Sequence, residues 1–418
     1  MKSELVQKAY EIAKERYAAM GVDTEKVLEQ MQDFHLSLHC WQADDVKGFE
    51  VQAGELTGGI QATGNYPGAA RNIDELRADI VKAKSYIPGT HRLNLHEIYG
   101  DFKGKVVDRD EVTPEYFESW IEWAKENNMK LDFNSTSFSH PKSGNLSLAN
   151  PDEGIRNFWI EHTKRCREIS EAMGKAQGDP CIMNLWVHDG SKDQTVNKYL
   201  YRSLLKDSLD KIFATKYDNM KDCIESKVFG IGLESFTVGS NDFYTAYAAQ
   251  NNKLITLDTG HFHPTESVAD KVSAMLLYVP ELMLHVSRPI RWDSDHVTIM
   301  DDPTLDLFQE IVRAGALDRV HYGLDYFDAS INRIGAYVIG SRAAQKCMLR
   351  ALLEPLATLR KYEAEGKGFE RLALLEEEKA MPWQAVYDEF CLRNNVPVGD
   401  EFIADVEKYE AEVTSKRA

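Results

Sequence analysis

The stretch LITLDTGHFHPTESVADKVSAMLLYVPELMLHVS, residues 254–287, predicts one complete strand–helix–strand unit. Two short apolar runs, LITLDTG (254–260) and LMLHVS (282–287), flank a segment of helical periodicity, TESVADKVSAMLLYV (265–279). Apolar runs separated by a helix of this length are typical of parallel strands joined by a crossover helix.

Six further runs of the same kind follow the pattern along the chain. They are LSLHCW (36–41), RLNLHEIY (92–99), KLDFN (130–134), CIMNLWV (181–187), DCIESK (222–227) and RVHYGLD (319–325). Helical stretches lie between most of them, for example 72–86 and 113–128. Eight alternations predict an α/β protein with a (β/α)₈ TIM barrel, whose active site lies at the carboxyl ends of the strands.

The remaining segments divide the chain into three parts. We expect an N-terminal helical segment (1–33), the barrel (34–345) and a C-terminal helical extension (346–418). Only the first helix after the eighth strand is needed to close the barrel, so the extension is expected to contact a neighbouring subunit, with packing on its own barrel as the open alternative. The long Gly-rich connection 46–72 is favoured as a lid over the barrel mouth.

The composition is that of a globular protein without affinity for polyanions. The chain has 418 residues and a net charge of −18, which argues against nucleic-acid and anionic-membrane surfaces. Its six cysteines stand singly, so we expect six reduced thiols. The first 21 residues lack the apolar centre of a signal peptide, and no apolar run approaches the roughly 20 residues that a bilayer requires. We therefore expect a cytoplasmic protein.

Potential metal ligands gather at successive strand ends. Glu225, Asp258, His285 and Asp325 come from four consecutive strands and could converge on one ion near the barrel axis. His261, Asp293 and Asp295 lie just beyond strand ends and could hold a second ion closer to solvent. These nitrogen and oxygen donors suit Mn²⁺, Co²⁺, Mg²⁺ or Zn²⁺. Each fragment alone is more often a solvated turn or a core histidine, but four consecutive strand ends of this type predict two metals.

Longer phrases carry a family resemblance. The chain resembles the L-rhamnose isomerase family nearly end to end. The phrases that carry the resemblance are LHCWQADDV, GGIQATGNYPG, RLNLHEIY, ESKVFGIG, LDTGHFHPTE, MLHVSRPIRWDSDHV and GLDYFDASINRI. It implies an aldose–ketose isomerase that interconverts L-rhamnose and L-rhamnulose, usually with Mn²⁺, as a homotetramer. Zn²⁺, Co²⁺ or Mg²⁺ could occupy one of the two sites.

The resemblance also implies roles for single residues. The set His261, Asp293 and Asp295 matches the ligands of the catalytic metal, and the set Glu225, Asp258, His285 and Asp325 matches those of the structural metal. Lys227 matches a lysine beside O1 of the sugar. One departure is His188, which stands in NLWVHDG where the family is expected to carry proline.

The expected chemistry moves a hydrogen between C1 and C2 of the sugar. A metal-assisted hydride shift and an enediol formed by a protein base both remain open. Lys227, His96 and Asp325 are the candidate catalytic residues: Lys227 would stabilise charge on O1 and His96 would open the sugar ring. The candidate substrate contacts are Trp41, His96, Phe133, Trp186, Lys227 and His261. The aromatic side chains, with Trp292, could form an apolar wall for the methyl group of a 6-deoxy sugar.

Three other functions fit parts of the pattern. The protein could prefer a different aldose, which the sequence does not decide. A metal-dependent phosphodiesterase or endonuclease on a related barrel is disfavoured by the net charge of −18. A non-catalytic metal-binding or sugar-binding protein is disfavoured by Lys227 and His96 at strand ends.

Overall fold

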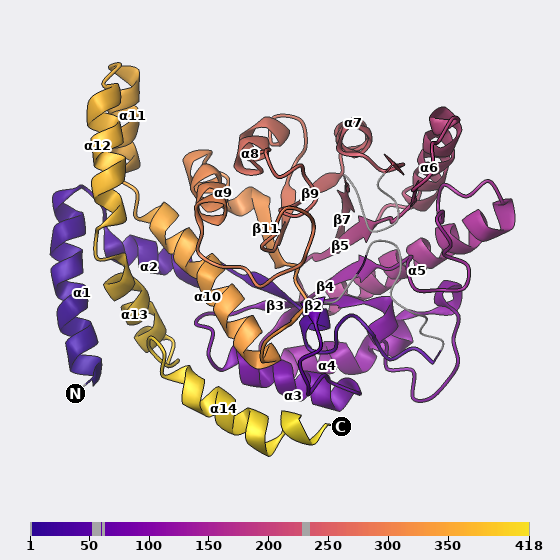
Figure 1. Ribbon diagram of the computed structural model, residues 1–418, viewed down its shortest axis with the longest axis horizontal. Helices are drawn as coiled ribbons and strands as arrows, with labels where there is room; N and C mark the ends of the chain where they lie inside the picture. The colour runs from indigo at the N-terminus through magenta and orange to yellow at the C-terminus, as the bar shows by residue number, and fades with distance from the viewer. Residues whose placement is uncertain (1, 52–59, 61–62, 228–234, 418) are drawn as a thin grey trace.

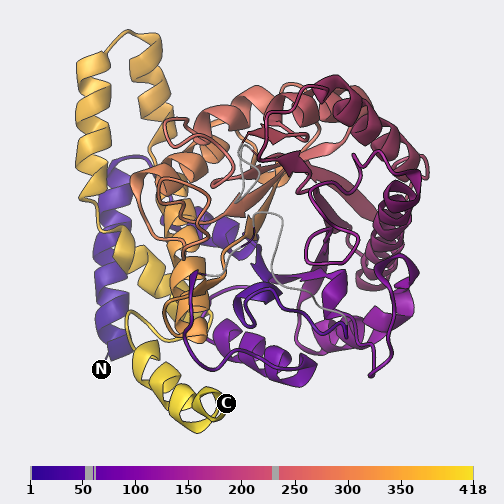
Figure 2. The same ribbon diagram turned by 45° about the vertical axis from the view of Figure 1, so that its right-hand side comes forward.

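A computed structural model describes residues 2–417 except 52–59, 61–62 and 228–234. Its centre is a closed barrel of eight parallel strands (Figures 1 and 2). They are β1 (Leu36–His39), β3 (Arg92–His96), β4 (Lys130–Ser135), β5 (Cys181–Trp186), β7 (Met220–Glu225), β9 (Leu254–Asp258), β10 (Leu282–Val286) and β11 (Val320–Leu324). Each strand pairs with its neighbours in chain order, and Leu36 of β1 pairs with Tyr322 of β11 to close the ring. The predicted TIM barrel is confirmed, with all eight strands where they were expected.

Helices surround the barrel in the order that the sequence pattern predicts. They are α3 (Ile73–Lys84), α4 (Glu118–Glu126), α5 (Glu153–Gln177), α6 (Lys198–Ile212), α7 (Asn241–Asn251), α8 (Ala269–Met275), α9 (Asp302–Arg313) and α10 (Arg333–Leu352). Short 3₁₀ helices span Cys40–Gln42, Glu97–Tyr99, Arg109–Glu111, Pro114–Phe117, Leu317–Arg319 and Thr414–Lys416. Side chains cap several helices. At the start of α3, Asn72 accepts a hydrogen bond from the Glu75 N–H at 2.9 Å, and at the start of α9, Asp301 accepts one from the Thr304 N–H at 3.0 Å.

Helix α8 is shorter than the stretch 265–279 predicted from its periodicity. It begins at Ala269, because the preceding residues form a turn held by their own side chains. His263 Nδ1 lies 2.7 Å from the Thr265 hydroxyl, and the Glu266 N–H donates to the His263 carbonyl at 2.8 Å. Such local side-chain bonds compete with the first turn of a helix.

Two small sheets tie loops together at the barrel mouth. Strand β2 (Thr63–Gly64) pairs with β12 (Asp328–Ala329), and β6 (Gly190–Ser191) pairs with β8 (Phe236–Thr237). The long connection 46–72 is thus anchored near its end, and near its start the Phe49 N–H donates to the Ile98 carbonyl at 2.7 Å. Its middle, 52–59 and 61–62, lies outside the described residues, so the lid remains a prediction.

The terminal helices form a layer beside the barrel (Figure 1). They are α1 (Lys2–Ala19), α2 (Thr24–Gln32), α11 (Leu356–Ala364), α12 (Gly368–Lys379), α13 (Trp383–Arg393) and α14 (Phe402–Glu412). Helix α13 packs along α1, and Arg393 pairs with Glu25 at 2.7 Å. Near the C-terminus, Arg417 pairs with buried Asp79 of α3 at 2.5 Å. Helix α13 and the C-terminal residues of the extension thus pack on other segments of their own chain, and the expected contact with a neighbouring subunit stays a prediction.

Two features of α10 to α12 concern the C-terminal part of the chain. Helix α10 runs without a break through the expected boundary at 345/346. The pair α11–α12 projects away from the barrel (Figure 2), with Phe369 and Leu372 of α12 82% and 60% exposed.

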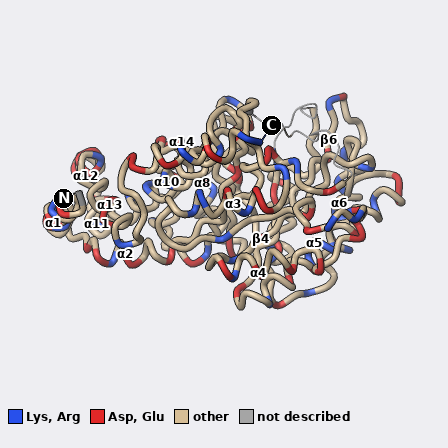
Figure 3. Tube along the Cα trace, turned by 90° about the horizontal axis from the view of Figure 1, so that it is seen from below, with Lys and Arg blue, Asp and Glu red and all other residues tan. Residues whose placement is uncertain are grey.

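The cysteines and the charged residues lie as the composition of the sequence leads us to expect. All six cysteines are free and buried, as predicted. Acidic and basic residues are interspersed along the chain rather than separated into one basic face (Figure 3). Among the described helices, none combines the length and the apolar character that crossing a membrane requires.

Candidate metal centre and active site

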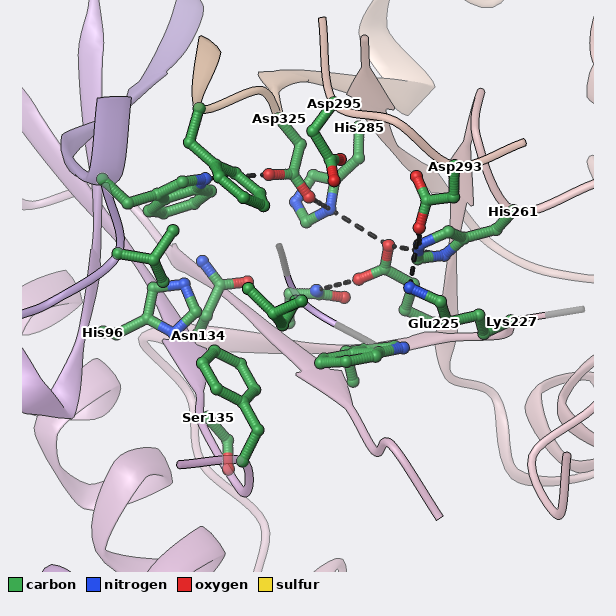
Figure 4. Close-up of a pocket in the computed structure, with 17 residues that line it drawn as sticks. His96, Asn134, Ser135, Glu225, Lys227, His261, His285, Asp293, Asp295 and Asp325 are labelled. Atoms are coloured by element: carbon green, nitrogen blue, oxygen red, sulfur yellow. Dashed lines mark hydrogen bonds and ion pairs between the residues drawn. The ribbon is translucent and has the colours of Figure 1, made fainter. Parts of the chain in front are cut away.

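A cavity opens at the carboxyl ends of the barrel strands (Figure 4). It is lined by Trp41, Val46, Ile60, His96, Asn134, Ser135, Phe138, Asn184, Trp186, Glu225, Lys227, His261, His285, Asp293, Asp295, Asp325 and Phe327. The carboxylates and imidazoles at the ends of β7 to β11 contribute most of its charged groups. Its aromatic rings come from β5 and from the segments that follow β1, β4 and β11.

The structure brings together the four residues expected to form the inner metal site. One ligand atom from each of Glu225, Asp258, His285 and Asp325 lies within 4.8 Å of the others. The Nδ1 atom of His285 is 3.2 Å from Glu225 Oε1 and 3.3 Å from Asp325 Oδ2. These residues converge because each stands at the carboxyl end of its strand, with its side chain on the inner face.

A second cluster shares Asp258 with the first. His261 and Asp293 join Asp258, again with ligand atoms within 4.8 Å. His261 Nε2 is 3.1 Å from Asp293 Oδ2 and 3.8 Å from Asp258 Oδ2. Its Nδ1 atom lies 2.8 Å from the Ser226 carbonyl, which can only accept, so Nδ1 carries the hydrogen and Nε2 is left as a ligand.

Asp295 departs from the arrangement expected for the outer site. It lines the same cavity and is 93% buried, since its exposed fraction is 7%. Its carboxylate, however, belongs to neither ligand group found among the described residues. The backbone at Asp295 has a φ of +48°, a left-handed conformation that is uncommon outside glycine, asparagine and aspartate. The turn therefore directs this side chain differently from that of Asp293.

The charges of the two clusters fit bound cations. Burial raises the pKa of Asp258 well above its usual value, and the carboxylates of Asp293 and Glu225 raise it further. Burial would lower the pKa of His261, but Asp258 and Asp293 outweigh it and raise that pKa well above its usual range. Within the described part of the chain, Asp258 Oδ2, His285 Nε2 and Asp293 Oδ1 are buried without a hydrogen-bond partner. Unpaired buried acceptors are costly, and divalent cations would satisfy them.

Lys227 lies beside the second cluster. Its Nζ atom is 2.6 Å from Asp293 Oδ2 and 4.8 Å from the centroid of the Trp186 ring. Burial would lower the pKa of Lys227, but Asp293 and Asp295 raise it above the ordinary value, so the side chain is a buried cation. Asn184 reaches the inner cluster from the neighbouring strand, where its amide donates to Glu225 Oε2 at 2.5 Å.

His96 and Trp41 form the opposite wall. The two rings pack edge to face with centroids 4.6 Å apart, and Nδ1 of His96 contacts the hydroxyl of Thr136. Burial lowers the pKa of His96 to about 3, so the imidazole is neutral. The indole N–H of Trp41 donates to Asp325 Oδ1 at 2.8 Å, which links this wall to the inner cluster.

Two aromatic residues predicted as wall residues lie elsewhere. Phe133 is fully buried outside the barrel and packs edge to face on Phe117, with centroids 5.1 Å apart. Side chains alternate along a strand, and Asn134 is the neighbour that faces the cavity. Trp292 lines a separate surface hollow together with His263.

Sequence reasoning missed several residues of the site. Phe138, Phe327 and Val46 belong to loops, which have no periodicity that would predict their direction. Asn184 could have been found, because it stands two residues before Trp186 on the same strand face. His188 does not line the cavity: its ring nitrogens contact the Ser137 hydroxyl and the Gly144 carbonyl, each at 3.1 Å.

Comparisons with known proteins cover the whole chain. The family model of L-rhamnose isomerase (RhaA) matches residues 4–417. An L-rhamnose isomerase of Bacteroides thetaiotaomicron is 84% identical over 416 residues and covers 100% of each chain. Those of Mannheimia succiniciproducens and Escherichia coli O127:H6 are 56% and 53% identical, with 99% of each chain covered. Among solved structures, a D-psicose 3-epimerase of Clostridium cellulolyticum H10 overlays 78% of this chain and 99% of its own, at 13% identity and a TM-score of 0.43.

Proposed function

The chain belongs to the L-rhamnose isomerase family, and on this basis we propose that two divalent cations at the barrel mouth support its aldose–ketose isomerisation. The activity is the interconversion of L-rhamnose and L-rhamnulose. The phosphodiesterase or endonuclease considered from the sequence has no support, since the family model and the relatives named above are isomerases.

The observation that carries the metal proposal is the pair of ligand clusters that share Asp258. We assign Glu225, Asp258, His285 and Asp325 to the inner ion, and His261, Asp293 and Asp295 to the outer ion, with Asp258 facing both. Binding through Asp295 would need a rotation of its side chain toward His261. All donors are carboxylate oxygens and imidazole nitrogens without a thiolate, a set that suits Mn²⁺ and also Mg²⁺, Co²⁺ or Zn²⁺.

The chain's own residues have separate tasks around the sugar. When bound, the cations supply Lewis-acid polarisation of neighbouring sugar oxygens. Lys227, held cationic by Asp293, is placed to stabilise negative charge that develops on O1. His96, neutral and on the opposite wall, is placed to move a proton between the anomeric hydroxyl and the ring oxygen.

The apolar wall has a role in choosing the substrate. The rings of Trp41, Trp186, Phe138 and Phe327 line the cavity beside its polar groups. A methyl group at C6 gains by burial against such rings, whereas a hydroxyl at C6 would lose its hydration there. This favours a 6-deoxy aldose over its 6-hydroxy counterpart.

The direct test is a sugar-panel isomerisation assay on metal-stripped protein, with Mn²⁺, Mg²⁺, Co²⁺ and Zn²⁺ added back singly. We expect no turnover without metal, the best recovery with Mn²⁺, and L-rhamnose as the preferred sugar. Full activity in excess chelator, with metal analysis showing empty protein, would refute the metal assignment.

We also propose a cytoplasmic homotetramer. Six buried free thiols are typical of a reducing compartment. The exposed apolar side chains of the projecting α11–α12 pair support a subunit contact there.

A further inference from the structure

A buried polar network lies behind His96, outside both ligand clusters. Its centre is Thr136, the residue after β4, which is fully buried. The Thr136 hydroxyl contacts Nδ1 of His96, and no other side-chain partner of this ring nitrogen is found within the described ranges. Thr136 does not line the cavity and cannot touch the sugar through this hydroxyl while it is bonded to His96.

The backbone of Thr136 is held from both sides by buried side chains. Its N–H donates to Glu97 Oε2 at 2.9 Å, and its carbonyl accepts from the Arg109 guanidinium at 3.0 Å. The side chains of Glu97 and Arg109 are almost completely buried, with exposed fractions of 1% and 2%. Hydrogen bonds to charged groups are roughly twice as strong as neutral ones, so the Arg109 guanidinium holds this peptide unit firmly. Burial raises the pKa of Glu97 to about 8, so its carboxyl acts as a neutral acceptor near pH 7.

Holding Thr136 with the buried side chains of Glu97 and Arg109 costs free energy of desolvation. Burying the Arg109 guanidinium costs several kcal/mol in desolvation, and the attraction of its ion-pair partner Glu50, at 2.5 Å, often only offsets that cost. Such a network stabilises the fold little, but it does fix geometry. The hydroxyl that it fixes is aimed at the candidate ring-opening histidine.

A threonine hydroxyl suits the chemistry assigned to His96. In ring opening, the anomeric hydroxyl loses its proton, the C1–O1 double bond forms, the C1–O5 bond breaks, and the proton is returned to O5. No electron or net proton enters or leaves. The imidazole must accept and release a proton at one nitrogen, and a hydroxyl can donate to or accept from the other nitrogen in each state.

We propose that Thr136 is a positioning residue that fixes the imidazole of His96 for opening the sugar ring, and that Glu97 and Arg109 hold Thr136 in place. The inference rests on the proposed role of His96. It assigns to the loop after β4 a function that no sequence periodicity indicates.

The test compares Thr136→Val, which removes the hydroxyl at nearly constant volume, with Thr136→Ser, which retains it. Thr163→Val is the matched control, because Thr163 is equally buried and its hydroxyl donates to a helix carbonyl at 2.9 Å, away from the site. The metal-loaded enzyme is measured for kcat/KM with L-rhamnose, for inhibition by the acyclic sugar alcohol of the same configuration, and for melting temperature.

Thr136→Val should lower kcat/KM by about tenfold or more, which is part of the ~10²–10⁴-fold that a positioned acid–base group contributes. Inhibition by the acyclic sugar alcohol should stay unchanged, because that ligand has no ring to open. Deuterium at C2 of the sugar should slow Thr136→Val less than wild type, because ring opening becomes limiting. Thr136→Ser should restore turnover, and Thr163→Val should leave it unchanged.

Two results would overturn the inference. One is wild-type kcat/KM in Thr136→Val, and the other is a loss of inhibitor binding equal to the loss of kcat/KM, which indicates packing alone. The variant His96→Asn distinguishes the ring-opening role of His96 from the positioning role of Thr136. Full turnover in His96→Asn refutes the role of His96 itself. Lost turnover in His96→Asn with normal Thr136→Val refutes only the positioning role.

Discussion

The indole N–H of Trp41 donates to Asp325 Oδ1 at 2.8 Å, across the seam where the first and last strands of the barrel meet. Trp41 thus contacts both halves of the site, because its ring also packs against His96. A hydrogen bond of this kind orients a carboxylate for a metal without contacting the metal.

Trp41→Phe should weaken the inner metal site while keeping an aromatic wall. Loss of a residue that orients a metal ligand typically costs about 10–100-fold in metal affinity. Mn²⁺ titration of stripped protein measures the effect. Trp186→Phe is the control, since Trp186 lines the cavity but its Nε1 atom has no partner among the described residues. Equal metal affinity in the two variants would contradict the orienting role of Trp41.

The proposed inner ion should contribute mainly to the stability of the fold, and the proposed outer ion mainly to turnover. Glu225→Gln and Asp325→Asn remove charge from the inner cluster, so the rise in melting temperature on adding Mn²⁺ should shrink, because ligand binding stabilises the folded state in proportion to affinity. Asp295→Asn should retain most of that rise and mainly lower kcat. Thermal melts with and without Mn²⁺, and kcat on the same preparations, make the comparison. Equal losses of thermal shift in all three variants would refute the division into two sites.

Many residues of this site could be predicted from the alternation of side chains along strands. The residues that the prediction missed or misplaced depend on strand phase or on loops. The four inner residues could be predicted because each ends a strand of an eightfold repeat, where position alone fixes direction. Phe133 was predicted to contact the substrate, but the phase of its strand is opposite. The flanking Asp132 and Asn134 point into the barrel, so Phe133 points outward. The direction of Asp295 depends on a left-handed turn, which residue identity does not specify.

Asp44 should make stability depend on pH. Burial raises its pKa to about 7, although the Tyr99 hydroxyl and the Gly48 N–H each donate to its carboxylate at 2.8 Å. The folded protein therefore keeps this proton between about pH 4 and 7, where the unfolded chain has released it. The contribution of Asp44 to stability is present below pH 4 and is lost as the pH rises to about 7.

Asp44→Asn removes this titration while retaining an acceptor for Gly48. The difference in melting temperature between variant and wild type should shift in favour of the variant as the pH rises from 5 to 8. Differential scanning calorimetry at several pH values measures it, and the metal-loaded form is used throughout so that the ligand clusters contribute equally. A difference independent of pH would show that Asp44 is ionised in the folded protein.

The projecting α11–α12 pair should contribute to the assembly. Replacing Phe369 and Leu372 by serine removes two exposed apolar side chains that contact little within the chain. Light scattering should show a lower mass for this double variant at micromolar concentration, with unchanged helical content by circular dichroism. Arg371→Ser, between them, is the control. An unchanged mass would place the subunit contact elsewhere.

Lys227→Met should leave both metals bound and lower kcat by orders of magnitude. The lysine reaches the second cluster as a buried cation, 2.6 Å from Asp293, and methionine keeps most of its volume without the charge. Groups aimed at developing negative charge typically contribute about 10²–10³-fold to kcat. If Lys227 only balances Asp293, its loss should leave a buried unpaired carboxylate, lower the melting temperature and leave turnover per folded molecule nearly unchanged. Bound Mn²⁺ would then compensate that carboxylate, so the loss of stability should be largest in the stripped protein. Measuring kcat, metal content and melting temperature on one preparation separates the two roles, and near-normal kcat at full metal occupancy would exclude Lys227 from the chemistry.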